Sequence, residues 1–299
     1  MIMKKILFIL SVSSLLFAQT AGSSGLSFLK IGFNARNIAM GDFGVATAND
    51  VSALYYNPAL IADYVSPQLT FTHNQWMGDV TSELFGASFP LFGLPFAVGV
   101  NTTSISGFEV RSRPGEAEST FNVHYFYGSL STGFYVSENI SVGLTAKILY
   151  ESLFSDDASG LGFDFGIRYK NIIDDLDLAA SYSNVGSMNK LRNIETELPT
   201  DLRIGAAYNF HLQQVNSNVI ITGGMQQYTK TDDTHFHFGA EIFYDNLVAL
   251  RGGYMTGYES KGMTAGFGLL WNNFNIDYAF VPFDYSLGDS HIISLMYTF

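Results

Sequence analysis

Apolar and polar residues alternate along most of this chain. Ile140 and Val142 share one face of a stretch whose other face carries Ser141 and Gly143. A period of two is typical of a strand with one face in lipid and the other in a wet interior. The pattern predicts an all-β fold, a transmembrane β-barrel of fourteen antiparallel strands over residues 66–299. The predicted strands run over 66–77, 82–91, 94–104, 121–136, 139–151, 160–170, 175–185, 200–211, 217–228, 234–244, 247–257, 261–271, 273–282 and 289–299.

Short and long connections alternate between these strands. Outer-membrane barrels show this alternation because their periplasmic turns are short and their extracellular loops are long. The pattern would also accept one more hairpin near Gly107 to Arg111. Tight turns are predicted at Phe92-Gly93, Ser137-Glu138-Asn139, Asp245-Asn246 and Asn272-Asn273, and longer loops at 105–120, 152–159, 186–199, 229–233, 258–262 and 283–288.

The last predicted strand ends on an aromatic residue. Ile293, Leu295, Tyr297 and Phe299 share one face of it. A free, apolar edge strand of this kind would promote aggregation in a soluble protein, but in a closed barrel it pairs with the first strand. The motif resembles the C-terminal signal by which bacterial outer-membrane barrels are recognised for insertion. We therefore expect outer-membrane lipid and the barrel-insertion machinery as partners, and the outer membrane of a Gram-negative type bacterium as the location.

The other end of the chain reads as a secretory signal peptide over residues 1–18. Lys4 and Lys5 precede an apolar run from Ile6 to Phe17, and Ala18 offers a small residue for cleavage. The run is too short to span a bilayer as a helix. The sequence has no cysteine, which excludes disulfide bonds and a lipid-anchored N-terminus.

Composition narrows the possible partners. Only 14% of the residues are charged and 15% are aromatic, a balance that suits a wall with one lipid face. The formal net charge of −12 argues against nucleic acid as a partner. An acidic secreted β-sandwich is the alternative fold, although its strands would be shorter and its loops less regular.

The inward faces of the predicted strands carry charged residues. A wet lumen tolerates such charges or lets them pair. They are interpreted either as internal ion pairs that fix the register and hold a plug, or as a ring that selects solutes. The seven residues are Lys147, Asp164, Arg168, Arg203, Glu241, Arg251 and Asp277.

The sequence shows no catalytic signature and predicts no cofactor. An enzyme at this membrane would need a nucleophile, a base and an orienting group, and no such set stands out. His235 and His237 share a strand face with Glu241 nearby, but two histidines without a third placed ligand are weak evidence for a metal. We expect neither an enzyme nor a metal site.

Residues 19–65 do not alternate, and we interpret them as an N-terminal hatch, a plug within the barrel. The segment is too apolar to remain in water and too short to form its own core, whereas a lumen of fourteen strands is wide enough to accept it. A short helix is predicted from Val51 to Tyr56 with Asp50 as its N-cap, ended by Asn57-Pro58.

This segment resembles the N-terminal signature of the PorV/PorQ family of outer-membrane proteins. The resemblance rests on Ala35-Arg36, on Ala39-Met40-Gly41, and on the run from Ala48 through Asp50 to Asn57-Pro58-Ala59. Leu60 and Tyr56 depart from the family pattern, where glycine and tryptophan are common. The resemblance implies a fourteen-stranded barrel with an N-terminal hatch. The PorV/PorQ family is related to the long-chain fatty-acid transporter barrels.

Two functions follow from the resemblance. Some PorV/PorQ relatives serve the type IX secretion system, which implies secretion-system proteins as partners and the loops 105–120 and 186–199 as their surfaces. The transporter relatives instead move hydrophobic molecules past the hatch, and the apolar residues of this segment fit that alternative. An elongated apolar cavity would favour transport, and a lumen filled with salt bridges would count against it. The apolar residues are Phe28, Leu29, Phe33, Ile38, Met40 and Phe43.

Overall fold

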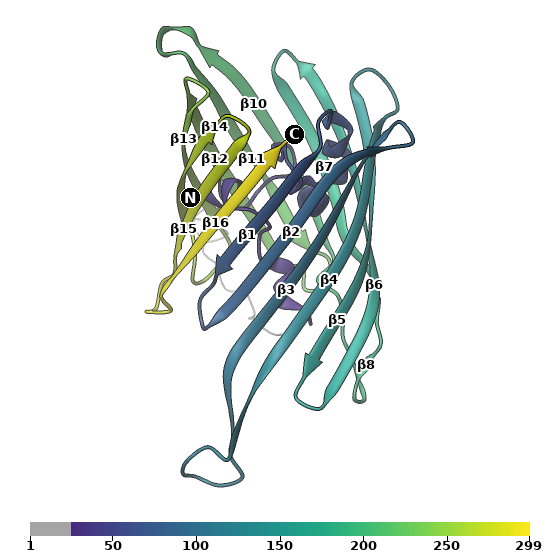
Figure 1. Cartoon of the computed structure of the whole chain (residues 1–299), viewed down its shortest axis with the longest axis vertical. Coiled ribbons are helices and arrows are strands. Elements are labelled where there is room, and N and C mark those ends of the chain that lie inside the picture. The colour runs from purple at the N-terminus through teal and green to yellow at the C-terminus, as the bar shows by residue number, and fades with distance from the viewer. Residues whose placement is uncertain (1–24) are drawn as a thin grey trace, which may run out of the picture.

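The computed structural model describes residues 25–299 and shows a closed, all-antiparallel barrel of fourteen strands (Figure 1). Each predicted stretch corresponds to one strand, so the predicted fold and strand number are confirmed. The strands are β1 (Gln68–Gln75), β2 (Val80–Leu91), β3 (Leu94–Val110), β4 (Ser119–Tyr135), β5 (Ile140–Leu153), β6 (Asp156–Ile173), β7 (Leu176–Met188), β10 (Asp201–Leu212), β11 (Ser217–Tyr228), β12 (Thr234–Tyr244), β13 (Val248–Thr256), β14 (Met263–Trp271), β15 (Phe274–Pro282) and β16 (Asp289–Thr298).

The barrel closes between its first and last strands. β1 pairs with β16 from Gln68 opposite Thr298 to Gln75 opposite His291. β7 pairs with β10, because the short strands β8 (Lys190–Leu191) and β9 (Ile194–Glu195) form a separate hairpin in the connection between them. The signal peptide predicted over 1–18 and the first residues of the predicted plug lie outside the described residues.

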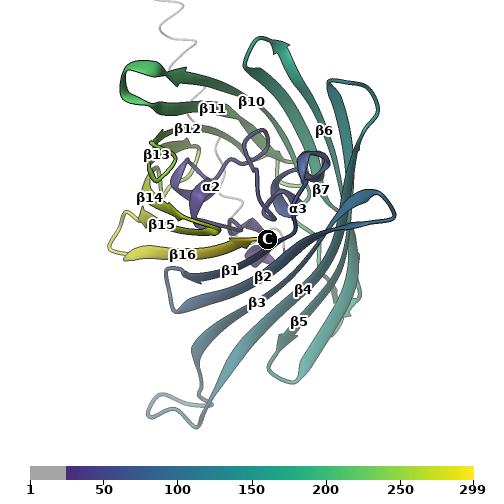
Figure 2. The same ribbon diagram turned by 45° about the horizontal axis from the view of Figure 1, so that its top comes forward.

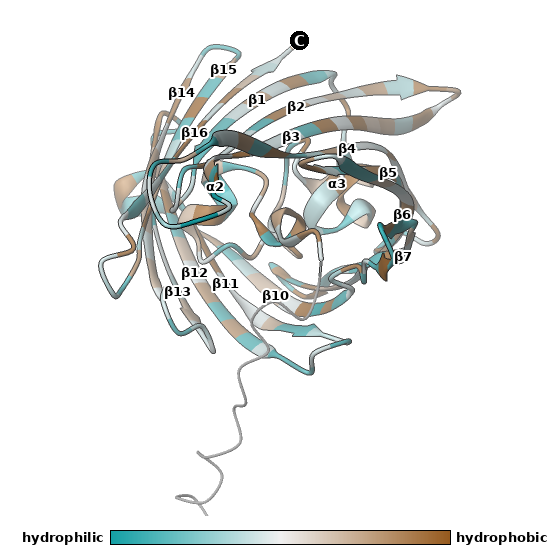
Figure 3. Ribbon diagram, turned by 90° about the horizontal axis from the view of Figure 1, so that it is seen from below, coloured by the Kyte–Doolittle hydropathy of each residue, from teal (hydrophilic) through white to brown (hydrophobic). Residues whose placement is uncertain are grey.

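The two faces of the wall differ in polarity. Outward side chains such as Phe165, Leu250 and Phe267 are large, apolar and exposed, whereas inward ones such as Thr145 and Ser181 are polar and buried. Figure 3 shows the resulting alternation of hydrophobic and hydrophilic residues along the strands. An apolar outer face on a closed barrel is the architecture of a protein that spans the bacterial outer membrane. Within residues 25–299, no helix is long and apolar enough to cross a membrane.

We call the end of the barrel that carries the β3–β4 hairpin the extracellular end, as the alternation of short and long connections predicts. This end differs from the prediction in two places. The expected loop 152–159 is a tight hairpin, because β5 continues to Leu153 and β6 already begins at Asp156. The segment Gly107 to Arg111 mostly continues β3, after a register shift relative to β4, and adds no hairpin of its own. The register shift between Ile105 and Phe108 breaks the period of two, and residues 152–157 are mostly polar, so neither segment continues the alternation of the strand before it. The long β3–β4 hairpin projects at the bottom of Figure 1, opposite the C-terminus.

Residues 25–64 lie inside the barrel, as the oblique view shows (Figure 2). The segment contains the 3-10 helices η1 (Ser27–Lys30) and η2 (Pro58–Asp63) and the short helices α2 (Ala35–Ala39) and α3 (Ala53–Tyr56). A third 3-10 helix, η3 (Gln213–Val215), forms a turn between β10 and β11. We refer to residues 25–64 as the N-terminal segment.

The predicted helix start at Val51 is wrong by two residues. α3 begins at Ala53, and Asp50 does not cap it. The Asp50 carboxylate instead accepts hydrogen bonds from the Ser52 amide (2.9 Å) and from the side chain of Asn34 (2.7 Å). A short Asx turn therefore outcompetes the first helical turn. The helix ends at Tyr56, before Asn57-Pro58, as expected.

Candidate functional site

Three inward-facing glycines lie side by side in the wall against the N-terminal segment. Gly133, Gly143 and Gly166 are cross-strand neighbours on β4, β5 and β6. A Cβ atom at Gly143 would lie 2.2 Å from the carbonyl carbon of Pro58 and 2.4 Å from the amide nitrogen of Ala59. The backbone of the segment therefore lies directly on the backbone of the wall, which only glycine permits.

Asn57 fixes this contact. Its side-chain oxygen accepts a hydrogen bond from the Ala59 amide (3.0 Å) and so caps η2. Its side-chain nitrogen donates to the carbonyl oxygens of Val45 (2.8 Å) and Ile167 in β6 (3.2 Å). The Asn57-Pro58-Ala59 motif thus holds one part of the segment to another and to the wall.

A second glycine contact holds the opposite side of the segment. Gly239 and Gly253 face each other across β12 and β13. A Cβ atom at Gly253 would lie 2.0 Å from the Gly41 nitrogen, and one at Gly239 would lie 2.3 Å from the Met40 oxygen. Gly41 itself has a φ of +80°, in the region that favours glycine. Its amide donates a hydrogen bond to Thr264 Oγ1 on β14 (3.0 Å).

Arg36 joins α2 to the wall by a buried ion pair. Its guanidinium group binds both carboxylate oxygens of Glu241 on β12, at 3.0 and 2.8 Å, and donates to the Thr47 carbonyl (2.8 Å). Glu241 also pairs with Arg251, which in turn pairs with Asp277 (2.6 Å). Burial alone would lower the pKa of Arg36, but the Glu241 carboxylate outweighs it and raises that pKa.

A second ion pair ties the end of the segment to the periplasmic half of the wall. Asp63 accepts hydrogen bonds from Arg168 (2.7 Å) and from the Tyr135 hydroxyl. Burial would raise the pKa of Asp63, but these hydrogen bonds and the positive charge of Arg168 outweigh it and lower that pKa.

The remaining lumen charges pair within the wall. Lys147 bonds to Asp164 (2.7 Å) and to the Asn184 side chain (2.9 Å), and Arg203 bonds to Asp201 (2.7 Å). All seven predicted lumen charges are buried and point inward. Three of them contact the N-terminal segment: Glu241 and Arg168 by ion pairs, and Arg203 through the Tyr55 ring, whose centroid lies 5.0 Å from the guanidinium carbon. The other four are bonded to residues of the strands.

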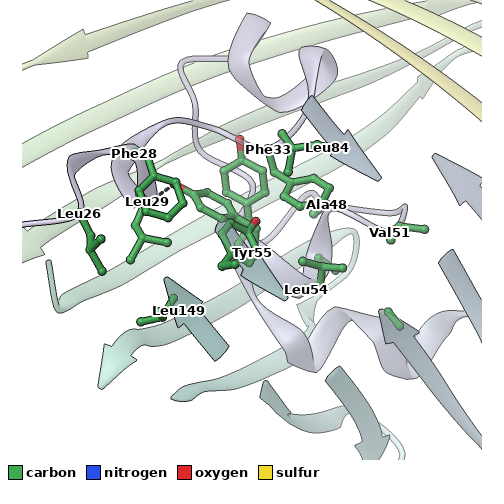
Figure 4. Packing of buried hydrophobic residues seen from close by; sticks show 14 of the residues in the cluster. Leu26, Phe28, Leu29, Phe33, Ala48, Val51, Leu54, Tyr55, Leu84 and Leu149 are labelled. Atoms are coloured by element: carbon green, nitrogen blue, oxygen red, sulfur yellow. Dashed lines mark hydrogen bonds between the residues drawn. The ribbon is translucent and has the colours of Figure 1, made fainter. Parts of the chain in front are cut away.

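An apolar cluster fills the lumen beside these charges (Figure 4). The ring of Phe28 stacks on that of Tyr125 in β4, with 4.9 Å between centroids. Leu149 and Met188 reach the cluster from β5 and β7, and Leu198 reaches it from the connection before β10. The lumen therefore holds both an apolar region and a set of salt bridges, the two features expected to distinguish transport of hydrophobic molecules from protein secretion.

A groove of about 670 Å³ opens at the extracellular end, between the β3–β4, β5–β6 and β7–β10 connections. Its apolar surface comes from Phe121, Leu153, Phe154, Leu191 and Ile194. The volume lies within the usual range for small-molecule sites. The sequence pattern did not identify this groove, because its residues come from three separate connections.

The groove borders the lumen cluster. Leu191 lines the groove and also packs against the cluster. Thr196 lines the groove and contacts the start of the N-terminal segment, since a Cβ atom at Gly25 would overlap the Thr196 methyl group. The Gly25 amide donates a hydrogen bond to the Glu197 carbonyl (3.0 Å). Apolar surface thus continues from the outside to the N-terminal segment.

The histidine pair has structural contacts. The Nδ1 atom of His237 is 2.6 Å from the Gly41 carbonyl oxygen, and His235 stacks on Tyr258. Glu241 is occupied by two arginines. No group of three or more histidines or acidic residues among residues 25–299 is arranged to hold a metal ion.

The C-terminal residues Ile293, Leu295 and Phe299 are exposed on the outer face, and Tyr297 also points outward. Their recognition by the insertion machinery stays a prediction.

Comparisons with known proteins identify related folds. No family model matches the sequence, and no curated protein matches it, so the resemblance to PorV/PorQ proteins finds no support there. The Pseudomonas putida toluene transporter TodX is similar in structure, with a TM-score of 0.65 and 14% identity over 89% of this chain and 98% of that one. The Ralstonia pickettii toluene transporter TbuX (TM-score 0.62, 15% identity, 90% and 98% covered) and the monoaromatic hydrocarbon channel CymD (TM-score 0.62, 15% identity, 89% and 97% covered) are also similar. This chain therefore shares the fold of outer-membrane transport barrels.

Proposed function

We propose that this protein is a non-enzymatic outer-membrane barrel for the uptake of hydrophobic small molecules, with the N-terminal segment as its hatch. The observation that carries the proposal is the apolar path from the extracellular groove through Leu191 to the cluster around Phe28. The structurally similar proteins are toluene transporters and a monoaromatic hydrocarbon channel, which supports the same function.

The position of the N-terminal segment explains why it would act as a hatch. The segment fills the lumen between the groove and the periplasmic end. Two close contacts with glycines of the wall and two ion pairs hold it there. A captured molecule must pass this segment. The first described residues, from Gly25 to Lys30, are the part that borders the groove, so they would move first.

Protein secretion was the main function implied by the resemblance. No observation in the described part of the chain favours it, whereas the groove and the similar folds favour transport. The loops 105–120 and 186–199, expected to be partner surfaces, contribute residues to the groove. Their contact with secretion-system proteins stays a prediction.

Uptake by intact cells tests the proposal. Gram-negative cells that produce the protein should take up radiolabelled toluene faster than cells with an empty vector. Phe154→Ser removes an apolar side chain from the groove and should lower the gain about threefold to tenfold. Phe92→Ser is the control, because Phe92 is exposed in the turn between β2 and β3 at the opposite end. Equal uptake with and without the protein, at matched folded amounts, would refute the proposed function.

A further inference from the structure

Two arginines line the extracellular groove, and each is paired with a carboxylate. Arg192 Nε lies 2.5 Å from Asp156 Oδ2, and Arg111 forms an ion pair with Glu109. All four residues line the groove beside its apolar surface. Both members of each pair lie in the groove. A ligand would therefore meet each arginine with its positive charge already neutralised by a carboxylate.

We propose that Glu109 and Asp156 make the groove selective for uncharged apolar molecules and against carboxylates of the same skeleton. The inference rests on the proposed function and names its substrate class. An unpaired arginine binds a carboxylate by charge-assisted, often bidentate hydrogen bonds. A carboxylate ligand here would have to displace Asp156 or Glu109, or lose its own hydration without a partner.

The surrounding charges act in the same direction. Over residues 105–120, 152–159 and 186–199, which supply most of the groove, seven acidic residues outnumber four basic ones, and the whole chain carries a formal charge of −12. Glu151 lies beneath the groove, where it accepts a hydrogen bond from Thr196 (2.8 Å). Lys190, another base of this region, is opposite Glu195 in the β8–β9 hairpin. An anion therefore approaches against the local field, whereas a neutral hydrocarbon does not.

The volume and the lining fit such a ligand. About 670 Å³ accommodates one or two fused aromatic rings, and Phe121 and Phe154 present rings that form an edge-to-face pair (5.3 Å between centroids). A neutral aromatic molecule gains apolar burial without a charged group to desolvate.

The test compares naphthalene with 2-naphthoate, which share a ring system and differ by a carboxylate. Binding to the purified full-length protein in nanodiscs is measured by equilibrium dialysis with fluorescence detection at pH 7.5, with empty nanodiscs subtracted. We expect naphthalene to bind at least about tenfold more tightly than 2-naphthoate. Asp156→Asn and Glu109→Gln each release an arginine and should tighten 2-naphthoate binding about threefold to tenfold, with naphthalene binding unchanged.

Asp157→Asn is the matched control. Asp157 is adjacent and exposed and carries the same charge, but it does not line the groove. If this variant tightens 2-naphthoate binding as much as Asp156→Asn, general electrostatics explain the effect and the proposal is overturned. Equal or tighter binding of 2-naphthoate by the unaltered protein would also overturn it, while leaving hydrophobic uptake intact. If neither compound binds, the proposed function itself fails. Heat-dependent gel mobility verifies that each variant barrel is folded.

Discussion

Adding a single methyl group to the wall should loosen the N-terminal segment. Gly253 and Gly252 are neighbours on β13 but face opposite sides of the wall. A Cβ atom at Gly253 would lie 2.0 Å from the Gly41 nitrogen, whereas the nearest atom to a Cβ at Gly252 is 4.0 Å away. Gly253→Ala must therefore push α2 and Gly41 off the wall, and Gly252→Ala must not.

The magnitude follows from the contacts that would be lost. Gly41 donates to Thr264 Oγ1 (3.0 Å), Thr264 donates to the Ala39 carbonyl (2.9 Å), and His237 Nδ1 lies 2.6 Å from the Gly41 oxygen. Three such hydrogen bonds contribute about 0.5–1.5 kcal/mol each. If the segment stayed in place, overpacking would cost about 1–3 kcal/mol instead. We take about 3 kcal/mol, which corresponds to roughly a hundredfold change in the equilibrium for detachment.

Amide hydrogen exchange measures this equilibrium directly. In the Gly253→Ala protein, amides of residues 38–42 should exchange roughly a hundred times faster than in the unaltered protein, while those of β5 and β6 stay protected. The Gly252→Ala protein should match the unaltered one. Equal protection of residues 38–42 in both variants would refute the claim that close backbone contact holds the segment.

Three further changes test the other attachments. Arg36→Met leaves Glu241 with Arg251 as its only ion-pair partner among the described residues and should destabilise docking by about 2–3 kcal/mol, seen as faster exchange in α2; unchanged exchange would contradict this. Asn57→Ala removes the cap of η2 and two further hydrogen bonds and should destabilise docking of the segment by about 2 kcal/mol. The segment should then be cut faster by a protease, whereas Asn189→Ala, on an exposed loop, should leave the rate of cleavage unchanged. Because the pKa of Asp63 is lowered on folding, its pairing contributes fully above the ordinary value of 3.8 and is lost as the pH falls through the lowered pKa. Protection of the η2 amides, measured relative to their intrinsic exchange rates, should thus fall with acid below pH 4, and Asp63→Asn should weaken that dependence. An identical pH profile in the variant would contradict the assignment.

Much of the barrel was predictable because its pattern is repetitive. Alternation such as that around Ile140 and Ser141 depends only on which face meets lipid, so each strand carries its own evidence. The seven lumen charges were found for the same reason, but their partners were not. Glu241 and Arg36 are 205 positions apart, and no local pattern connects them.

The N-terminal segment and the groove were harder to predict. Asn34 caps α2 through its side chain, and asparagine before a helix is a cap signal that the sequence carries. At Asp50 a cap was expected, and a turn to Ser52 formed instead. The groove depends on three connections that meet only in the closed barrel, although two of them, 105–120 and 186–199, are surfaces that the sequence predicts for partners.

The barrel wall is uneven in height. β3, β4 and β6 have 17, 17 and 18 residues, whereas β13, β14 and β15 have 9 each. Eight additional residues lengthen a strand by roughly 25 Å. The taller side carries the mouth of the groove beyond the rim formed by β13, β14 and β15. For the uptake proposed above, a sparingly soluble compound arriving from outside would therefore meet this mouth before it reached the lower rim.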